Sequence, residues 1–332
     1  LADILKFSEH ANAMVHPFGA MHHFWVFKWF YMKEDIMKKK ISLMLAAALT
    51  AGLALTGCGG SKTSDITESS AAGAESESAA EVKGVDVDTT GYLVAALNAD
   101  IQTADVQKTS KDYEVPFNIF DRLVDVEVDA DGNSKIVPSL AESWDISDDG
   151  LEYTFHLRQG VKFHNGNDFT AEDVAYTFHR LLTVEGGVNT EFIDQIKGAD
   201  ELLAGETDTL EGVEVVDDYT IKVTLKEPFA GFLASISSPG VSIYDSEATE
   251  AAGDQFGMDP AVTVGTGPFE FASWSFNNQL VLTRNEDYWK GASELPGVVI
   301  KIIPDTETQS MMFESGELDI LDLDYAADSV DR

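Results

Sequence analysis

The chain has 332 residues and a formal net charge of -36, because 58 acidic side chains outnumber 22 basic ones. Hydrophobic residues make up 44% of it, which is enough for a large core and excludes global disorder, and the length suggests two domains or one with appendages. The excess of acid argues against nucleic acid as a partner, because little basic surface is present to neutralise phosphates. A single cysteine, Cys58, excludes an intrachain disulfide and a zinc site built from cysteines.

A lipoprotein signal peptide is predicted at residues 37–57. Three lysines at 38–40 precede the uncharged stretch 41–55, which is too short for a comfortable membrane span. The sequence Leu55-Thr56-Gly57-Cys58 resembles the bacterial lipobox, in which the cysteine receives a diacylglyceryl group and the signal is cut before it. We therefore expect Cys58 to be the lipidated first residue of the mature protein. The alternative is a retained membrane helix with an incidental cysteine.

Two further segments of the N-terminal region differ from a folded domain. Residues 1–36 precede a complete signal peptide, so we expect them to be a translated leader with Met37 as the natural start. Codons for Lys33-Glu34-Asp35 can form a purine-rich ribosome-binding site at a suitable distance. Residues 58–84 follow the cut and are rich in Ser, Ala and Glu without any aromatic side chain. Such a composition cannot offset its ordering entropy, so this segment is predicted to be a flexible tether.

The globular part is predicted to begin near Val85 and to mix strands and helices irregularly. Period-2 patterns and turn residues predict four strand pairs, 126–128 with 135–137, 143–146 with 151–157, 213–216 with 220–225 and 269–274 with 280–283. Further strands are predicted at 161–163 and 298–303. Helices are expected at 117–123, 170–182, 229–237 and 306–315. Thr170-Ala171-Glu172-Asp173 resembles a capping box at the start of the second of these helices. The fold class is therefore α/β or α+β with mixed sheets.

No catalytic residue, metal ligand or cofactor site is predicted. His156, His164 and His179 could form a three-histidine site, but the spacing gives no reason for them to converge, so ordinary core or surface roles are favoured. The Gly-x-Ser-x-Gly nucleophile motif is absent. Gly265-Thr266-Gly267 lacks a third glycine at dinucleotide spacing and runs into Pro268, which disfavours a phosphate loop. The Asp-rich stretch 129–133 lacks the spacing of a calcium loop and is expected to be a turn.

Three groups of motifs resemble one known family. The first comprises Pro-Ser-Leu-Ala-Glu-Ser-Trp at 138–144 and the stretches 153–158, 160–166 and 170–174. The second is Val-Gly-Thr-Gly-Pro-Phe at 264–269 with Arg-Asn at 284–285 and Tyr-Trp at 288–289. The third is Phe-Glu-Ser-Gly-Glu-Leu-Asp-Ile at 313–320. Together they resemble the family 5 extracellular solute-binding proteins, the oligopeptide-, dipeptide- and nickel-binding components of ABC importers, along roughly residues 90–325.

This resemblance implies a periplasmic-binding-protein-like α/β fold of class II, multi-lobed with mixed sheets. It places a first segment of lobe I at 85–122, lobe II at 123–240 and the continuation of lobe I at 241–332. The sequence stops where lobe III would begin, so we expect only lobe II and part of lobe I to be present, in a chain cut short at its C-terminal end.

The resemblance also implies the partners and the cellular location. A receptor of this kind is lipid-anchored on the outer face of the cytoplasmic membrane, closes about a hinge around its ligand and delivers it to a permease driven by a cytoplasmic ATPase. The expected ligand is a short peptide, with nickel complexes or other small solutes as alternatives, and the complete protein is expected to be a monomer. A lipoprotein of the same fold serving adhesion or solute sensing is the alternative function.

Ligand-binding residues follow from the same resemblance. Three segments are placed beside the cleft, although each residue could instead be an ordinary solvated loop residue. They are Lys108, Thr109, Ser110 and Tyr113 in the first segment, Ser237 and Ser238 in the second, and Asp322, Asp324 and Tyr325 in the third.

Overall fold

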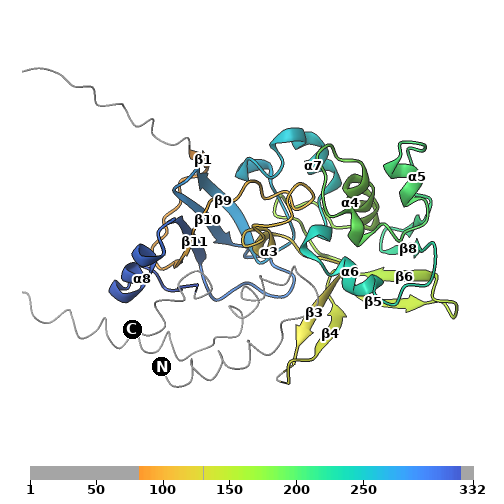
Figure 1. Ribbon diagram of the computed structural model, residues 1–332, viewed down its shortest axis with the longest axis horizontal. Helices are drawn as coiled ribbons and strands as arrows, with labels where there is room; N and C mark the ends of the chain where they lie inside the picture. The colour runs from red at the N-terminus through yellow and green to blue at the C-terminus, as the bar shows by residue number, and fades with distance from the viewer. Residues whose placement is uncertain (1–81, 130, 323–332) are drawn as a thin grey trace, which may run out of the picture. The chain divides into compact units, whose positions relative to one another are not determined.

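A computed structural model describes residues 82–129 and 131–322 of the chain (Figure 1). Cys58, the predicted signal peptide, most of the predicted tether, Asp324 and Tyr325 lie outside the described residues. Within the described part, no helix is long and apolar enough to cross a membrane.

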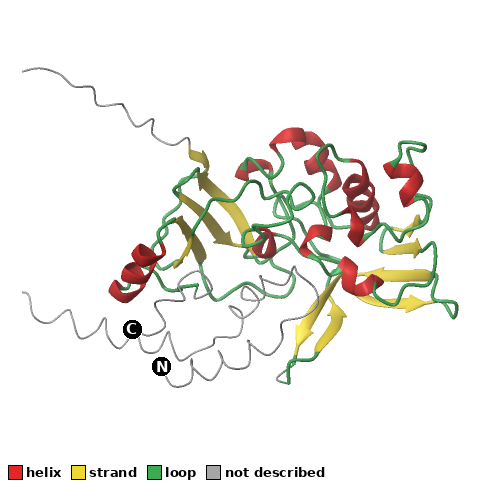
Figure 2. Ribbon diagram, viewed as in Figure 1, coloured by secondary structure: helices red, strands yellow, loops and turns green. Residues whose placement is uncertain are grey.

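A five-stranded sheet unites strands from both ends of the described chain, which differ in colour in Figure 1 and are the yellow arrows on the left of Figure 2. Its order is β1-β9-β10-β11-β2, with bounds Val82–Gly84, Phe269–Ser275, Gln279–Arg284, Gly297–Ile302 and Leu93–Leu97. Neighbours are antiparallel except β11 and β2, which are parallel. The strand Val82–Gly84 therefore lies within the segment predicted to be a tether. Gly84 permits this because its backbone has a φ of +93° and lies against the carbonyl of Ala272, where a Cβ would collide.

A four-stranded antiparallel sheet is formed by the middle of the chain. Its order is β5-β6-β8-β7, with bounds Ala141–Ile146, Glu152–Leu157, Thr220–Thr224 and Val213–Asp217. Tyr153, Phe155 and Leu157 alternate along β6 and are buried in one core with the inner face of helix α4, Ala171–Thr183. The strands β3, Val124–Val128, and β4, Ser134–Pro138, pair separately as a hairpin. These hairpins confirm the pairings expected from the sequence.

The predicted capping box at the start of α4 is confirmed. The Asp173 carboxylate accepts from the backbone N–H and the hydroxyl of Thr170, at 2.9 and 3.3 Å. Its other oxygen accepts from the backbone and hydroxyl of Ser246, both at 2.9 Å, at the first turn of α7, Ser246–Ala252. One carboxylate therefore fixes the starts of two helices.

The other helices are short, and three predicted elements differ from the structure. The predicted helix at 117–123 is only α3, Pro116–Ile119, because Phe120 turns extended and leads towards β3. The helix predicted at 229–237 is shorter in the structure, where α6 spans Phe232–Ile236. The chain folds back before this helix, so that the Phe229 ring packs against Gly231. At 161–163 there is only an isolated bridge between Lys162 and Asp168. The remaining helices are α5, Ala199–Leu203, α8, Thr306–Ser315, and 3-10 turns at Thr190–Phe192, Pro239–Val241, Gly253–Gln255 and Pro260–Val262.

Candidate functional site

The segment between β2 and α3, residues 98–115, contains the first group of predicted ligand residues. It has no regular secondary structure, yet half of its residues are buried, and its exposed tip is Ser110 and Lys111. The polar backbone groups of a buried irregular segment need hydrogen-bond partners from other backbone groups or from side chains. We call residues 98–115 the clamped loop, because polar contacts with other parts of the chain hold it, and two of these anchors lie near the predicted ligand residues.

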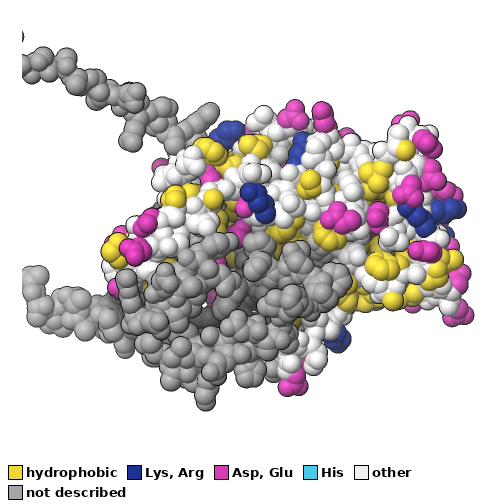
Figure 3. Space-filling model, in the orientation of Figure 1, with side chains coloured by type: hydrophobic (Ala, Val, Ile, Leu, Met, Phe, Trp, Pro, Cys, Tyr) yellow, Lys and Arg dark blue, Asp and Glu magenta, His cyan; other side chains and the backbone are white. Residues whose placement is uncertain are grey.

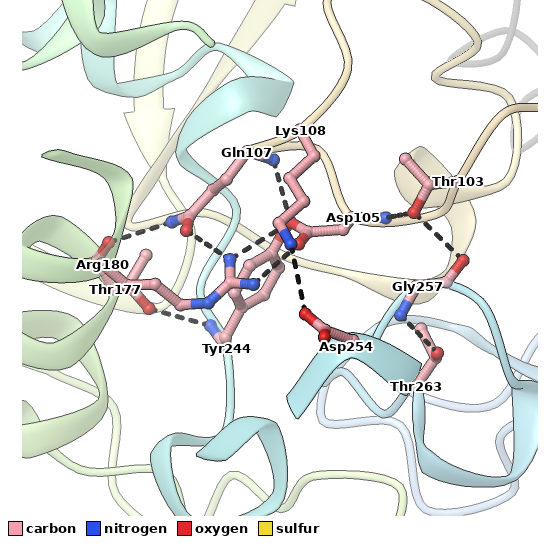
Figure 4. Close-up of polar contacts among 10 residues, drawn as sticks. All are labelled: Thr103, Asp105, Gln107, Lys108, Thr177, Arg180, Tyr244, Asp254, Gly257 and Thr263. Carbon is pink, nitrogen blue, oxygen red and sulfur yellow. Dashed lines mark hydrogen bonds and ion pairs between the residues drawn. The ribbon is translucent and has the colours of Figure 1, made fainter. Parts of the chain in front are cut away.

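The first anchor is a buried ion pair between the loop and α4 (Figure 4). Arg180 Nη2 lies 2.7 Å from Asp105 Oδ2, and the two side chains are 12% and 1% exposed. The hydroxyl of Tyr244 donates to Asp105 Oδ1 at 3.0 Å, and the guanidinium lies over the Tyr244 ring at 5.6 Å. Burial, reinforced by the charge of Asp105, raises the pKa of Tyr244 well above its ordinary value, so this phenol stays a hydrogen-bond donor.

Gln107 extends this anchor along α4. Arg180 Nη1 donates to Gln107 Oε1 at 2.6 Å, while Gln107 Nε2 donates to the carbonyl of Thr177 at 2.9 Å. The Thr177 hydroxyl in turn accepts from the backbone N–H of Tyr244 at 3.0 Å. Both charges of the ion pair therefore have hydrogen-bond partners, as a buried pair requires.

The second anchor is Asn189, which the sequence did not single out. Its backbone has a φ of 69°, its side chain is 6% exposed, and Nδ2 lies 2.8 Å from the carbonyl oxygens of Val106 and Thr109. The same nitrogen lies 3.2 Å from the hydroxyl oxygen of Tyr113. Gly240 packs so closely on the other side that a Cβ there would lie 2.9 Å from Asn189. Asn189 thus contacts both the clamped loop and the loop 237–240. These two segments contain the first and second groups of predicted ligand residues.

The structure gives different environments to the predicted ligand residues. Thr109 and Tyr113 are buried and brace the loop, because the Thr109 hydroxyl donates to the Lys111 carbonyl at 2.8 Å and the Tyr113 hydroxyl to the Thr109 carbonyl at 3.3 Å. Lys108 is partly exposed, with its Nζ 4.0 Å from Asp254, and Ser110 is exposed. Of residues 108–113, Ser110 and Lys111 are therefore the exposed ones, and Lys108 is partly exposed.

The other predicted positions lie at the ends of elements. The Ser237 hydroxyl donates to the carbonyl of Ala234 at 2.7 Å, directly after α6, and Ser238 precedes the 3-10 turn that contains Gly240. Asp322 is partly buried at the end of the described chain. A ligand-binding role for all these residues stays a prediction.

A second polar junction lies where the chain passes from α3 to β3. The Asp121 carbonyl accepts from the backbone N–H of Ile243 at 2.9 Å, so the outgoing and returning chain segments lie side by side. Its buried carboxylate accepts from Thr266 at 3.0 Å, Tyr288 at 3.1 Å and the Trp289 indole at 2.9 Å. This junction connects the loops around β9 and β10 to the entry of the middle segment.

His164 ties the same loops together from the other side. Its backbone N–H donates to the carbonyl of Gly265 at 2.8 Å, its Nδ1 accepts from the Gly265 N–H at 3.1 Å, and its Nε2 lies 3.0 Å from the Gly267 carbonyl. Gly265 and Gly267 pack against the backbone around Ile119, where a Cβ would collide. The glycines of this motif therefore serve close packing.

The other two histidines of the weighed three-histidine site have separate partners. His156 Nε2 lies 3.0 Å from Asp145, and His179 Nε2 lies 3.1 Å from the Asp208 carbonyl. In the part of the chain that the structure describes, no group of three or more His, Cys, Asp or Glu side chains is arranged to hold a metal ion.

The surface outside these junctions is acidic. Asp and Glu side chains occur on several parts of the face shown in Figure 3, and Lys and Arg are fewer there. An open depression of about 500 Å³ beside the four-stranded sheet is lined by Glu142, His156, Leu157, Gln159, Asp217, Asp218, Tyr219 and Thr220. None of the predicted ligand residues lines it.

Residues 135–331 match the bacterial extracellular solute-binding proteins, family 5, in their middle part. The chain belongs to this family. Heme-binding protein A of Haemophilus influenzae is 34% identical over 303 residues, covering 88% of this chain and 52% of that protein. The probable D,D-dipeptide-binding periplasmic protein DdpA of Escherichia coli is 34% identical over 235 residues, covering 69% of this chain and 43% of that protein.

Solved structures agree on the fold. Listeria monocytogenes OppA bound to peptide superposes with a TM-score of 0.64 at 27% identity, covering 72% of this chain and 48% of that one. The substrate-binding domain of an oligopeptide ABC transporter from Bacillus anthracis gives 0.63 at 28% identity, covering 68% and 44%. The chain thus spans about half the length of these relatives. The predicted family and its periplasmic-binding-protein-like mixed α/β fold are confirmed.

Sequence reasoning missed Asp105, Arg180, Asn189 and Tyr244. The ion-pair partners are 75 positions apart, so no local pattern joins them. Asn189 carried a weak signal, because an asparagine after Gly186 and Gly187 is a residue type that tolerates the left-handed backbone region.

Proposed function

We propose that the chain is the ligand-capturing part of a solute-binding component of an ABC importer, and that its ligand is a short peptide. The observation that carries this proposal is its membership of family 5, among relatives whose names include several di- and tripeptide-binding proteins. The Listeria monocytogenes structure of similar fold holds a peptide. Binding and release without catalysis is the activity expected of such a component.

The clamped loop supports this proposal physically. A peptide offers carbonyl oxygens and a terminal carboxylate, which hydroxyl and ammonium groups such as those of Ser110, Lys108 and Lys111 can bind. Two buried anchors fix the loop before any ligand arrives, which reduces the entropy lost on binding. Adhesion or solute sensing is the alternative use of the same fold, and uptake of labelled peptide by cells with and without the gene separates it from import.

The ligand class is tested by mass spectrometry of solutes that co-purify with the protein. We expect short peptides of mixed sequence. Recovery of haem would refute the peptide proposal and indicate the ligand named for the Haemophilus influenzae relative. Recovery of only a nickel complex or a sugar would also refute it.

We further propose that Cys58 is lipidated and holds the protein on the outer face of the cytoplasmic membrane, beside a permease with a cytoplasmic ATPase. The lipobox resemblance and the tether-like composition of 59–81 support this. Cys58→Ala should release the protein or leave an uncleaved precursor, whereas Ser61→Ala, in the adjacent segment, should change neither. A Cys58→Ala protein that stays in the membrane fraction at mature size would contradict the proposal.

A further inference from the structure

We propose that Asn189 is a positioning residue for ligand capture, which holds the clamped loop in its binding-ready conformation. This inference rests on the proposed function, because it assigns Asn189 a task in peptide binding. The side chain itself is buried, so it acts through the loop.

The chemistry around the side chain requires a hydrogen-bond donor. Two of its three neighbours are the carbonyl oxygens of Val106 and Thr109, which can only accept. An amide nitrogen satisfies both, whereas a carboxylate in its place would face two oxygens without a proton to share. The third neighbour, the Tyr113 hydroxyl, can only share one of the two amide hydrogens with a carbonyl, and it donates its own hydrogen to the Thr109 carbonyl.

The backbone around this contact is held in conformations that need support. Asn189 has a φ of 69° and Asp112, near the loop tip, has a φ of 64°. Non-glycine residues in this region cost free energy and persist where the surroundings over-determine them. Asn189 supplies such support from outside the loop. The hydrogen bonds from Thr109 to the Lys111 carbonyl and from Tyr113 to the Thr109 carbonyl, by contrast, lie within the loop.

The position of Asn189 connects the loop to a second predicted ligand segment. Gly240 leaves room for the asparagine where a Cβ would crowd it, and the N–H of Val188 donates to the Gln107 carbonyl at 2.7 Å. The Asp105 anchor holds the loop at its N-terminal side, and Asn189 holds the part that leads to the exposed tip at Ser110 and Lys111. Loss of the amide should therefore loosen the tip while the Asp105 anchor remains.

The test uses the full chain with two variants of this position. Asn189→Gly keeps a residue that accepts a positive φ and removes the amide, and Asn189→Asp keeps the shape but replaces the donor by a carboxylate. Asn277→Gly is the matched control, because Asn277 has a φ of 55°, its side chain is exposed in the β9–β10 turn, and the substitution keeps the backbone N–H that donates to Asp100. Amide hydrogen exchange is measured over residues 106–113, and calorimetry measures binding of tri-alanine well below each unfolding midpoint.

We expect faster exchange over 106–113 and about tenfold weaker tri-alanine binding in both Asn189 variants, with a larger entropic penalty, because the loop is then ordered only on binding. The control should match the parent. A residue that merely stabilises the fold would leave the affinity of the folded variant unchanged, so parent-like affinity overturns the proposal even if exchange is faster.

Unchanged exchange in the Asn189 variants would also overturn it, whatever the affinity. If the parent binds neither tri-alanine nor any co-purified peptide, the proposed function is refuted. The exchange measurement then still decides whether Asn189 fixes the loop.

Discussion

The pH dependence of stability should reveal the protonation state of His164. Because the Gly265 N–H donates to Nδ1, that nitrogen carries no proton, and the hydrogen on Nε2 points to the Gly267 carbonyl. A second proton on Nδ1 would face the Gly265 N–H. Burial against this loop lowers the pKa of His164 from 6.5 to about 4, although the Gly267 carbonyl acts in the opposite direction.

The magnitude follows from linkage. The folded state favours the neutral form of His164. The contribution of this histidine to the free energy of unfolding is therefore fully present above about pH 6.5 and is lost as the pH falls towards about 4. At about 1.4 kcal/mol per pH unit, the total loss is about 3 kcal/mol, and about 2 kcal/mol of it has occurred by about pH 5.

The assay compares urea unfolding of the parent and His164→Asn near pH 7.5 and near pH 5. The asparagine can still accept from Gly265 but does not titrate in this range, so the parent should lose about 2 kcal/mol more than the variant. The many carboxylates of the chain contribute to both proteins and cancel in this difference. His179→Asn, at a partly exposed histidine on α4, is the control and should behave as the parent. A nuclear magnetic resonance titration in which His164 protonates above about pH 6 would refute the reasoning.

Two further substitutions test the packing of the junctions. Gly265→Ala should lower the free energy of unfolding by at least about 2 kcal/mol in urea denaturation, because the new Cβ would collide with the backbone of α3, and a parent-like midpoint would contradict this. Asp173→Ala should lower it by about 2 kcal/mol, because it removes the acceptor for both Thr170 and Ser246. Glu172→Ala, at the exposed neighbour, should cost much less, and equal losses for the two would show that the capping interactions do not matter.

Local patterns predicted the local parts of the fold. The hairpins β3–β4, β5–β6, β7–β8 and β9–β10 combine alternating side chains with short turns, and both signals lie within about 20 residues of sequence. The start of α4 was equally readable, since the capping box at Thr170 and Asp173 is a four-residue pattern. Family resemblance supplied the overall architecture, which these local signals do not contain.

Contacts between distant segments could not be read in the same way. The strand β1 pairs with β9 and β2 pairs with β11, and each partner follows roughly 190–205 residues later. No short turn joins either pair, so no local signal indicates the pairing. The candidate site has the same property, because Asp105 and Asn189 acquire their roles only from residues brought near by folding. The predicted loop positions near 108–113 were adjacent to the anchors without including them.

The three polar junctions also constrain which parts can move when a ligand binds. The contacts of Arg180 with Asp105 and of His164 with Gly265 join the middle segment to the loops of the five-stranded sheet, and the contact of Asp121 with Trp289 lies at the entry of the middle segment. Separating the two sheets would leave these buried groups unpaired, at about 1–3 kcal/mol for each neutral group and more for the ion pair. A ligand bound at micromolar affinity contributes only about 8 kcal/mol in total, so it could not open all three junctions and still bind tightly. If hinge closure operates in this chain, the two sheets therefore act as one rigid side of the hinge.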